Sequence, residues 1–359
     1  MIWKLMMKTL NNNLNDRQNA ILAFIETSRS ASIRQIFEYV QKNLGQVAKI
    51  TISRDLEKLL ETGFIERQGA GRAVTYRLSP RYLIIKKVNV EEYFSQDVDQ
   101  RKIKEIFNFD IFDQLKNIFT DDEKNKLNEL NKTYREKIKD IPDDALRKEI
   151  ERLNIDFSWK SSKIEGNTYS LLETEQLIKN QQEASGHTKE EAIMILNHKK
   201  ALDYVGNNKK DFQSVSVAKI ENIHSLIVDN LNVTKNLRKS LIGITGTNYK
   251  PLDNEFQIRE ALEKACDLVN QTKDVFEKAV ILMLLIAYIQ PFVDGNKRTS
   301  RLSGNAILQS FDSCLLSYRS MDEIEYKKAI LLFYEQNNIS YFKELFLKQF
   351  EFAVENYFG

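Results

Sequence analysis

The chain has 359 residues, of which 42% are hydrophobic and 29% charged, and its formal net charge is +2. A chain of this length can form two or three domains with their own cores, and the small net charge neither requires nor excludes a nucleic-acid partner. The longest apolar run, residues 279–289, is shorter than the roughly 18 residues of a membrane-spanning helix. Because the start lacks a signal-peptide pattern and only two cysteines occur, we expect a cytoplasmic protein without a membrane partner.

Residues 14–79 have the pattern of a small independent domain, preceded by an N-terminal extension over residues 1–13. Apolar residues recur at helical spacing in three segments, and Asn15 or Asp16 and then Ser32 are suited to cap the first two. Gly63 follows the third segment and can end it in left-handed backbone. We expect helices at residues 17–28, 32–45 and 51–61, followed by strands at residues 64–68 and 73–78, with a glycine-rich turn between the strands.

The third helix and its flanks, Lys49-Ile-Thr-Ile-Ser-Arg-Asp-Leu-Glu-Lys-Leu-Leu-Glu-Thr-Gly-Phe-Ile65, resemble a winged helix-turn-helix of the DeoR-like type. Its leucines would face the core, which leaves a hydroxyl and cations on the opposite face, as suits a helix in the DNA major groove. The resemblance implies a DNA partner and a homodimer; a domain that only dimerises or binds protein is the alternative. The candidate DNA-binding residues are Lys49, Thr51, Arg54 and Lys58 in the helix and Arg67 and Arg72 in the wing.

Residues 80–119 are expected to form an ordered connector, in which residues 82–88 are a strand or an extended linker. From residue 120 to residue 359 nearly every segment has helical periodicity. The exception is residues 241–253, where glycines and a proline among β-branched residues predict a hairpin. The sequence therefore predicts a mainly α protein, with a winged helix-turn-helix followed by an all-helical domain that carries a β-hairpin flap.

One segment of the helical domain has the residues of a phosphate site. A buried apolar helix ends before Gln290, and a tight loop leads to a new helix near Asn296, whose free amides and dipole favour an anion. Arg298 and Arg301 are three residues apart, so both can clamp a polyphosphate from one helical face. The candidate nucleotide-binding residues are Gly295, Asn296, Lys297, Arg298 and Arg301, and Asp294 is the candidate Mg²⁺ ligand.

The string from Gln290 to Arg301 resembles the signature of the Fic family, His-Pro-Phe-x-Asp/Glu-Gly-Asn-Gly/Lys-Arg-x-x-Arg. Members of that family move AMP, or less often another phosphate-containing group, onto a protein hydroxyl, so the resemblance implies ATP, Mg²⁺ and a protein target. Two shorter segments agree with it, Asn197-His-Lys-Lys-Ala201 and Ile223-His-Ser-Leu226. Residues 237–251 resemble the flap that holds the target by strand addition, and the expected flap residues are Gly243, Ile244, Thr245 and Gly246.

A separate segment, Ser161-Ser-Lys-Ile-Glu165-Gly166, resembles the inhibitory pattern of the same family, Ser/Thr-x-x-x-Glu-Gly/Asn. Ser161 and Glu165 are four residues apart, so both face one way from a helix expected around residues 158–170. The resemblance implies that Glu165 pairs with Arg301 and takes the place of the γ-phosphate, which would hold ATP in an unproductive pose. A simple helix cap or surface salt bridge at Glu165 is the alternative.

Gln290 stands where the family has its histidine base. A glutamine amide can position a hydroxyl but cannot take its proton, and losing a general base typically costs on the order of 10²- to 10⁴-fold in rate. One hypothesis is a DNA-binding regulator whose Fic domain binds ATP and Mg²⁺ with impaired AMP transfer. The second is an autoinhibited protein adenylyltransferase of Ser, Thr or Tyr hydroxyls, in which Gln290 is an inactivating or tolerated substitution. A reaction that needs no base at this position, and a scaffold whose domains both bind protein, stay open, so the sequence does not decide whether the chain is an enzyme.

Overall fold

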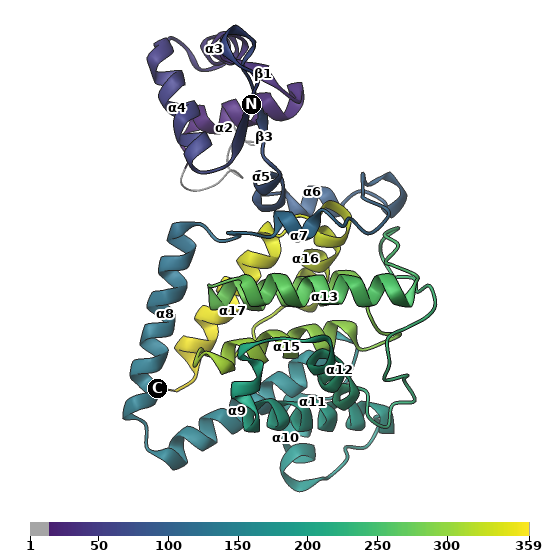
Figure 1. Cartoon of the computed structure of the whole chain (residues 1–359). Helices are drawn as coiled ribbons and strands as arrows, with labels where there is room; N and C mark the ends of the chain where they lie inside the picture. Colours follow the sequence, from purple (N-terminus) through teal and green to yellow (C-terminus); the bar gives the residue numbers. More distant parts are fainter. Residues whose placement is uncertain (1–13, 359) are drawn as a thin grey trace. The chain divides into compact units, whose positions relative to one another are not determined.

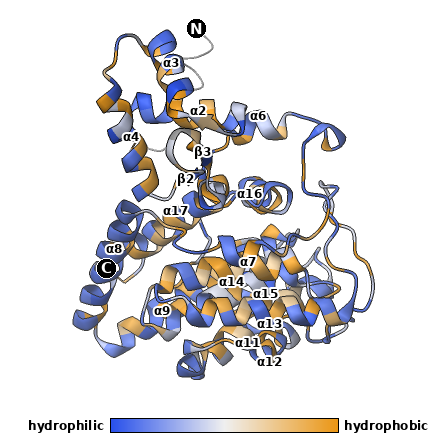
Figure 2. Ribbon diagram, turned by 45° about the horizontal axis from the view of Figure 1, so that its top comes forward, coloured by the Kyte–Doolittle hydropathy of each residue, from blue (hydrophilic) through white to orange (hydrophobic). Residues whose placement is uncertain are grey.

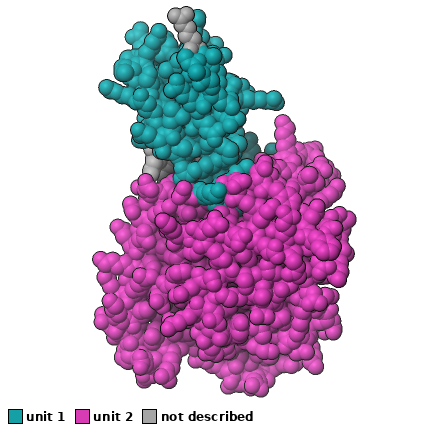
Figure 3. Space-filling view, in the orientation of Figure 1, with its two compact units in different colours: residues 1–97, 114–116, 338–341 teal, residues 98–113, 117–337, 342–359 magenta. Residues whose placement is uncertain are grey.

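The computed structural model describes residues 14–358 of the chain, and the expected extension over residues 1–13 lies outside the described residues. The chain divides into two compact units (Figure 3). Unit 1 comprises Met1–Asp97, Gln114–Lys116 and Asn338–Tyr341, and unit 2 comprises Val98–Asp113, Asn117–Asn337 and Phe342–Gly359. The first boundary between the units therefore falls inside the segment that we expected as a connector.

Within unit 1, residues 14–79 form three α-helices and a small antiparallel sheet (Figure 1). Asn15 and Ser32 each form a reciprocal capping box with the residue three positions on, which explains why the first two helices begin where the sequence predicts. The sheet has the order β1-β3-β2, and its short strand β1 is missing from the sequence interpretation because two residues are too few to show an alternating pattern. The elements are α2 (Asp16–Ser28), β1 (Ala31–Ser32), α3 (Ile33–Leu44), α4 (Lys49–Glu61), β2 (Ile65–Gln68), η2 (Gly71–Ala73) and β3 (Thr75–Leu78).

The region between residues 80 and 119 differs from the expectation at its start. Residues 82–88 were expected as a strand or linker, but α5 (Pro80–Ile85) is a helix, because Ser79 accepts a hydrogen bond from the Tyr82 amide and Pro80 occupies the first turn. Local capping therefore outweighs the strand preference of the apolar run. The other short elements of this region are α6 (Val90–Phe94), η3 (Val98–Gln100) and α7 (Ile111–Gln114).

Unit 2 is a helical domain built around one buried helix, α14 (Val275–Ile289). Every residue of α14 from Phe276 onward is buried, and Figure 2 shows the helix in the colours of hydrophobic residues. Helix α15 (Asn296–Ser310) packs closely on it, because a Cβ added at Gly304 would lie 2.5 Å from Met283 Cγ. The remaining elements are α8 (Asp121–Asp140), α9 (Asp143–Ile164), α10 (Leu171–Asn180), α11 (Lys189–Asn207), η4 (Lys209–Gln213), α12 (Val217–Ile227), α13 (Glu255–Gln271), α16 (Glu323–Gln336) and α17 (Ser340–Asn356).

The predicted hairpin at residues 241–253 takes a different form. The segment is an extended loop with a turn at residues 245–246, and an isolated parallel bridge joins Lys250 to Ile106. Arg101 donates to the carbonyl of Gly246 at 2.6 Å, and the Lys250 amide donates to the carbonyl of Glu105 at 2.7 Å. Partners from residues 99–106 thus satisfy backbone groups that a second hairpin strand would otherwise pair.

The mainly helical fold class is confirmed by this arrangement. Among residues 14–358, no helix is long and apolar enough to cross a membrane.

Candidate functional site

The site begins where α14 ends. Gln290 is the C-cap residue of α14 and has left-handed backbone, with φ 51° and ψ 59°. The buried guanidinium of Arg238 donates from Nε to the Gln290 carbonyl at 2.6 Å, and the Arg238 amide donates to the Pro291 carbonyl at 3.0 Å. A cation bound to the last carbonyls of a helix also interacts favourably with its dipole. Arg238 therefore fixes the chain as it leaves the core helix.

The loop that follows is held by its own polar groups. Asn296 accepts from the Phe292 amide at 2.8 Å and donates to the Phe292 carbonyl at 2.7 Å, which closes the loop into a ring. Gly295, the N-cap of α15, has φ 82°, and a Cβ there would lie 2.9 Å from Val228 Cγ1. Only glycine fits at this position, and its compactness lets the chain turn directly into α15. The free amides at the start of α15 then point out of the loop as anion donors.

A cavity of about 350 Å³ lies over the start of α15. It is large enough for a small-molecule ligand. It is bounded by the end of α9, the loop at residues 242–245, the α14–α15 loop and one face of α16. The lining residues are Glu165, Ile242, Gly243, Ile244, Thr245, Gln290, Val293, Asp294, Gly295, Asn296, Lys297, Arg298, Lys327, Ile330, Leu331 and Tyr334.

A carboxylate already occupies the cationic side of this cavity. Glu165 lies 2.9 Å from Arg301 Nη1 and 3.2 Å from Lys297 Nζ. Burial alone would raise the pKa of the Glu165 carboxyl, but the charges of Arg301, Lys297 and Arg298 outweigh it and lower that pKa to about 2. Glu165 is therefore an anion at neutral pH, bound where an anionic ligand would meet the same cations.

Arg301 is fully buried behind Glu165 and is held by a chain of hydrogen bonds. Its Nε donates to Ser161 Oγ at 3.0 Å and its Nη2 donates to the Ser161 carbonyl at 2.8 Å. Ser161 Oγ in turn lies 3.0 Å from His198 Nε2, while His198 Nδ1 lies 2.8 Å from the Met194 carbonyl. Burial lowers the pKa of His198 to about 3, so a neutral ring donates from Nδ1 and accepts the serine proton at Nε2. The four groups are consistent with a single proton arrangement that fixes the guanidinium.

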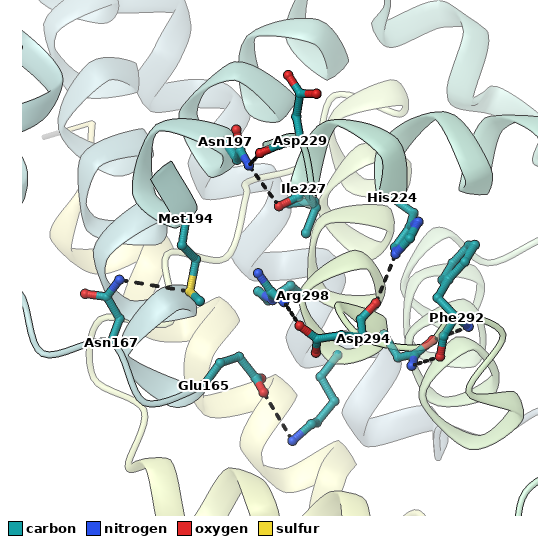
Figure 4. A network of polar contacts seen from close by, with 12 residues as sticks. Glu165, Asn167, Met194, Asn197, His224, Ile227, Asp229, Phe292, Asp294 and Arg298 are labelled. Carbon is teal, nitrogen blue, oxygen red and sulfur yellow. Dashed lines mark hydrogen bonds and ion pairs between the residues drawn. The ribbon is translucent and has the colours of Figure 1, made fainter. Parts of the chain in front are cut away.

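Asp294 and Arg298 form a second ion pair at the edge of the cavity. Arg298 Nη2 donates to Asp294 Oδ2 at 2.7 Å, and Figure 4 shows Arg298 and His224 approaching Asp294 from different sides. Arg298 Nη1 is buried and has no hydrogen-bond partner among the described residues. A buried donor left without a partner typically costs about 1–3 kcal/mol, so this nitrogen favours the arrival of an anion.

The residues present fit a phosphate-bound divalent cation rather than a protein-only metal centre. Within residues 14–358, no group of three or more His, Cys, Asp or Glu side chains could hold a metal ion. The Asp294 carboxylate lines the cavity and is more than half exposed. Mg²⁺ is commonly bound by one or two carboxylates with phosphate oxygens and water completing its shell. Asp294 can supply the protein share of such a site.

The Gln290 side chain is fixed inside the cavity wall. Its Nε2 donates to the Ala287 carbonyl at 2.6 Å and to the Tyr334 hydroxyl at 3.0 Å, and its Oε1 accepts from Asn296 Nδ2 at 3.0 Å. None of these groups is a base of neutral pKa. His224 of α12 lies beside the loop. Its ring stacks on Phe292, and its Nε2 lies 3.0 Å from the Asp294 carbonyl oxygen. Burial lowers the pKa of His224 to about 4, and its ring does not line the cavity, so it does not replace the missing base.

In unit 1, the candidate DNA-binding side chains lie on helix α4 and on the β2–β3 hairpin. Ile52, Leu56 and Leu59 are buried on one face of α4, while Lys49, Arg54 and Lys58 are exposed and Thr51 is half-buried. Arg67 is exposed at the end of β2. Arg72 lies in η2, and its side chain falls outside what the structure describes.

Residues 214–308 match the model of the Fic/DOC family. The match contains α12, α13, α14, the loop with Gln290 and most of α15. This part of the chain is a Fic/DOC family domain.

Two curated relatives agree with the Fic/DOC match in sequence. The chain is 25% identical over 170 residues to protein adenylyltransferase fic-1 of Caenorhabditis elegans, which covers 46% of this chain and 33% of that protein. It is 28% identical over 185 residues to protein adenylyltransferase Fic of Nematostella vectensis, which covers 48% of this chain and 42% of that protein. The chain thus spans about a third to two-fifths of the length of these relatives.

Solved structures agree with the Fic/DOC fold. A structure of Fic-1 (residues 134–508) from C. elegans superposes with a TM-score of 0.57 at 17% identity and covers 96% of this chain and 98% of that one. A Fic domain-containing signaling protein from Bacteroides thetaiotaomicron superposes with a TM-score of 0.55 at 16% identity and covers 64% of this chain and 94% of that one. At these identities the likeness concerns the fold alone.

The Fic/DOC cavity brings together most of the residues that the sequence singled out. Arg301 and Ser161 lie behind Glu165 rather than on the cavity wall, and Gly166 and Gly246 are also outside the lining. The helix that carries Ser161 differs from the expected span of residues 158–170, because α9 begins at Asp143 and ends at Ile164 with Glu165 as its C-cap.

Sequence reasoning missed three residues that shape the site. Arg238 holds the end of α14, Tyr334 binds the Gln290 amide, and Lys327 lines the cavity from α16. Arg238 stands among polar and basic neighbours such as Lys235 and Lys239, so the sequence gave no sign that it is buried. The residues of α16 gave no signal, because none of them falls in a recognisable motif.

Proposed function

We propose that unit 2 binds a nucleoside triphosphate with a divalent cation and has the architecture of an autoinhibited protein adenylyltransferase. The observation that carries the proposal is the Glu165 carboxylate bound to Arg301 and Lys297 at the anion-binding end of α15. A carboxylate in that place is a competitor for the terminal phosphate of a nucleotide. The relatives that bear the name protein adenylyltransferase make ATP the first candidate ligand.

The cavity supports the placement of a triphosphate. The amides at the start of α15, Lys297 and the unsatisfied Nη1 of Arg298 are donors that favour phosphate oxygens. Asp294 would hold Mg²⁺, which would supply positive charge to neutralise part of the phosphate charge. Residues 242–245 line the opposite wall and would support a target segment beside the nucleotide.

AMP transfer would form a bond between a target hydroxyl oxygen and the α-phosphorus and break the bond to the β-phosphate oxygen, so that pyrophosphate leaves. The hydroxyl proton must go to a base as this happens. Gln290 occupies the cavity wall with its amide committed to Ala287, Tyr334 and Asn296, and an amide cannot take that proton. We therefore propose that this chain binds nucleotide well once Glu165 is displaced, and transfers AMP poorly.

Nucleotide binding is tested by calorimetry with ATP and Mg²⁺. The Glu165→Gly variant is expected to bind at least about 10-fold more tightly than the unmodified chain, because removing the competing carboxylate frees two cations for phosphate. Glu165→Gln removes the charge but keeps the side-chain volume. Its affinity for ATP is expected to lie between those of the unmodified chain and Glu165→Gly.

The matched control is Gln181→Gly, which also places a glycine at a helix C-cap, here the exposed end of α10 outside the cavity. It should leave the affinity unchanged. The proposal is wrong if Glu165→Gly binds no nucleotide while its thermal unfolding stays cooperative.

A second function is proposed for unit 1, that of a winged helix-turn-helix that binds duplex DNA. It is favoured by α4, which exposes Lys49, Arg54 and Lys58 opposite its buried face, and by the hairpin with exposed Arg67. The order of helices and strands in unit 1 also fits that class of domain.

DNA binding is tested by fluorescence anisotropy with a labelled 20-base-pair duplex of random sequence over a range of salt concentrations. The unmodified chain should bind with a steep salt dependence, and each of Arg54→Ala and Lys58→Ala should flatten the logarithmic slope by about one. Lys42→Ala, an exposed change on α3, is the control. Salt-independent or absent binding would exclude a DNA partner of this kind, and light scattering on the same samples reports whether the bound form is the expected homodimer.

A further inference from the structure

The segment that carries Glu165 is anchored unevenly. On one side Glu165 ends α9, and its amide donates to the Ser162 carbonyl at 3.0 Å. On the other side stands Gly166, which has φ 100° and open space around an added Cβ. The last turn of a helix opens easily, and a glycine beside it gives the chain freedom to swing. The Gly166 amide donates to the Lys163 carbonyl at 2.9 Å and the Asn167 amide to the Ser162 carbonyl at 3.2 Å, and side-chain contacts beyond Gly166 add to this hold.

Glu191, in the first turn of α11, binds the chain three residues after Glu165. Its Oε1 accepts from the Thr168 amide at 2.7 Å and from Thr168 Oγ1 at 2.6 Å. Its Oε2 accepts from the amide of Thr188 at 2.9 Å, as part of the α11 capping box. The hydrogen bonds from Thr168 Oγ1 and the Thr188 amide lower the pKa of Glu191 to about 2, so the carboxylate stays charged at neutral pH.

The main chain of Glu191 adds a further contact. Asn167 Nδ2 donates to the Glu191 carbonyl at 2.9 Å, and Asn167 Oδ1 accepts from the Tyr169 amide at 3.0 Å. Trp159 on α9 also donates from Nε1 to the Tyr169 carbonyl at 3.0 Å. We call Glu191, Asn167 and Thr168 the clasp. It ties the chain just after Glu165 to the N-terminus of α11.

We propose that the clasp is a positioning device for the inhibitory carboxylate, with Glu191 as its central residue. This inference rests on the proposed function. In the proposed release, Glu165 leaves Arg301 and Lys297 as the last turn of α9 and residues 166–168 move together. Each hydrogen bond of the clasp must break or stretch in that movement. The clasp therefore lowers the apparent affinity for nucleotide without touching it.

The test measures the affinity for ATP with Mg²⁺ in the full chain by calorimetry. Glu191→Ala and Thr168→Val are each expected to raise the affinity by about 3- to 10-fold over the unmodified chain, a part of the gain from Glu165→Gly. A merely structural role predicts loss of affinity or no change. A gain in affinity for ATP therefore distinguishes the positioning role from a simple loss of fold stability.

Two controls match the change in charge and the change in capping. Glu190→Ala removes the exposed neighbouring carboxylate, and Thr120→Ala weakens the equivalent capping box at the start of α8 and touches no clasp residue. Neither should raise the affinity. An increase with Glu190→Ala as large as that with Glu191→Ala would overturn the proposal.

A double-variant comparison tests the clasp separately from the proposed nucleotide binding. In a chain that already carries Glu165→Gly, the added Glu191→Ala change should alter the affinity less than twofold, because no inhibitory carboxylate remains to be positioned. A full further gain would show that Glu191 acts on the nucleotide by another route. If Glu165→Gly binds ATP tightly but Glu191→Ala and Thr168→Val behave like the unmodified chain, the clasp is wrong and the proposed function stands; if Glu165→Gly does not bind, the proposed function itself fails.

Discussion

A chain that carries both Glu165→Gly and Gln290→His is expected to transfer AMP at least about 100-fold faster than one that carries Glu165→Gly alone. The reason is that histidine restores a general base of near-neutral pKa at the cavity wall, a gain on the order of 10²- to 10⁴-fold. The measurement is the incorporation of label from α-labelled ATP into the chain itself and into the proteins of a cell extract.

The backbone at position 290 is suited to this exchange. Left-handed backbone with φ 51° is uncommon for glutamine, whereas histidine and asparagine are enriched in that region. Gln290→Asn in the Glu165→Gly background is therefore the matched control, since it fits the same backbone but supplies no base. Equal labelling with His and Asn at this position would contradict the assignment of the base to position 290, and labelling in neither would exclude AMP transfer by this scaffold.

Arg301→Leu is expected to lower the free energy of unfolding by about 3 kcal/mol and to abolish nucleotide binding. The guanidinium is fully buried and serves Glu165, Ser161 and the face of Tyr326 together, and removing one partner of a buried pair typically costs about 3–5 kcal/mol. We expect the lower end of this energy range because Lys297 remains beside Glu165 and still pairs with its charge. Urea unfolding followed by circular dichroism measures the change.

The same ion pair predicts the acid dependence of stability. The folded pKa of Glu165 is about 2, below its ordinary value of 4.5, so the pair stabilises the fold above pH 4.5 and the stabilisation is lost as the pH falls toward 2. The difference in unfolding free energy between the unmodified chain and Glu165→Gln should therefore shrink across that window. A difference that stays constant from pH 6 to pH 3 would mean that Glu165 is not held as an anion by Arg301.

Much of the fold could be predicted from local signals. Asn15 and Ser32 cap helices through side chains that bond their own neighbours, and the apolar run at residues 279–289 is long enough to require burial on every side. These interactions act within a few residues, so the sequence displays them directly. The strand or linker predicted at residues 82–88 was wrong, because the apolar composition favours a strand while the Ser79 cap and Pro80 start a helix.

The residue types of the candidate site could be predicted from the sequence, because the loop from Gln290 to Arg301 is continuous in the chain. The shared helical face of Ser161 and Glu165 could be predicted in the same way. The contacts of that loop depend on tertiary packing. Packing brings Glu165 onto Arg301 from 136 residues away, sets Arg238 under the end of α14, and lays residues 99–106 beside the expected flap.

The clasp is of the same kind, since Thr168 and Glu191 are 23 residues apart and meet only because α9 and α11 pack together. Such contacts depend on the shapes of whole helices and on which buried polar groups find partners, and neither is written in local periodicity. The sequence thus predicts a phosphate site without a base, and the tertiary structure places the Glu165 carboxylate at the cationic side of the cavity.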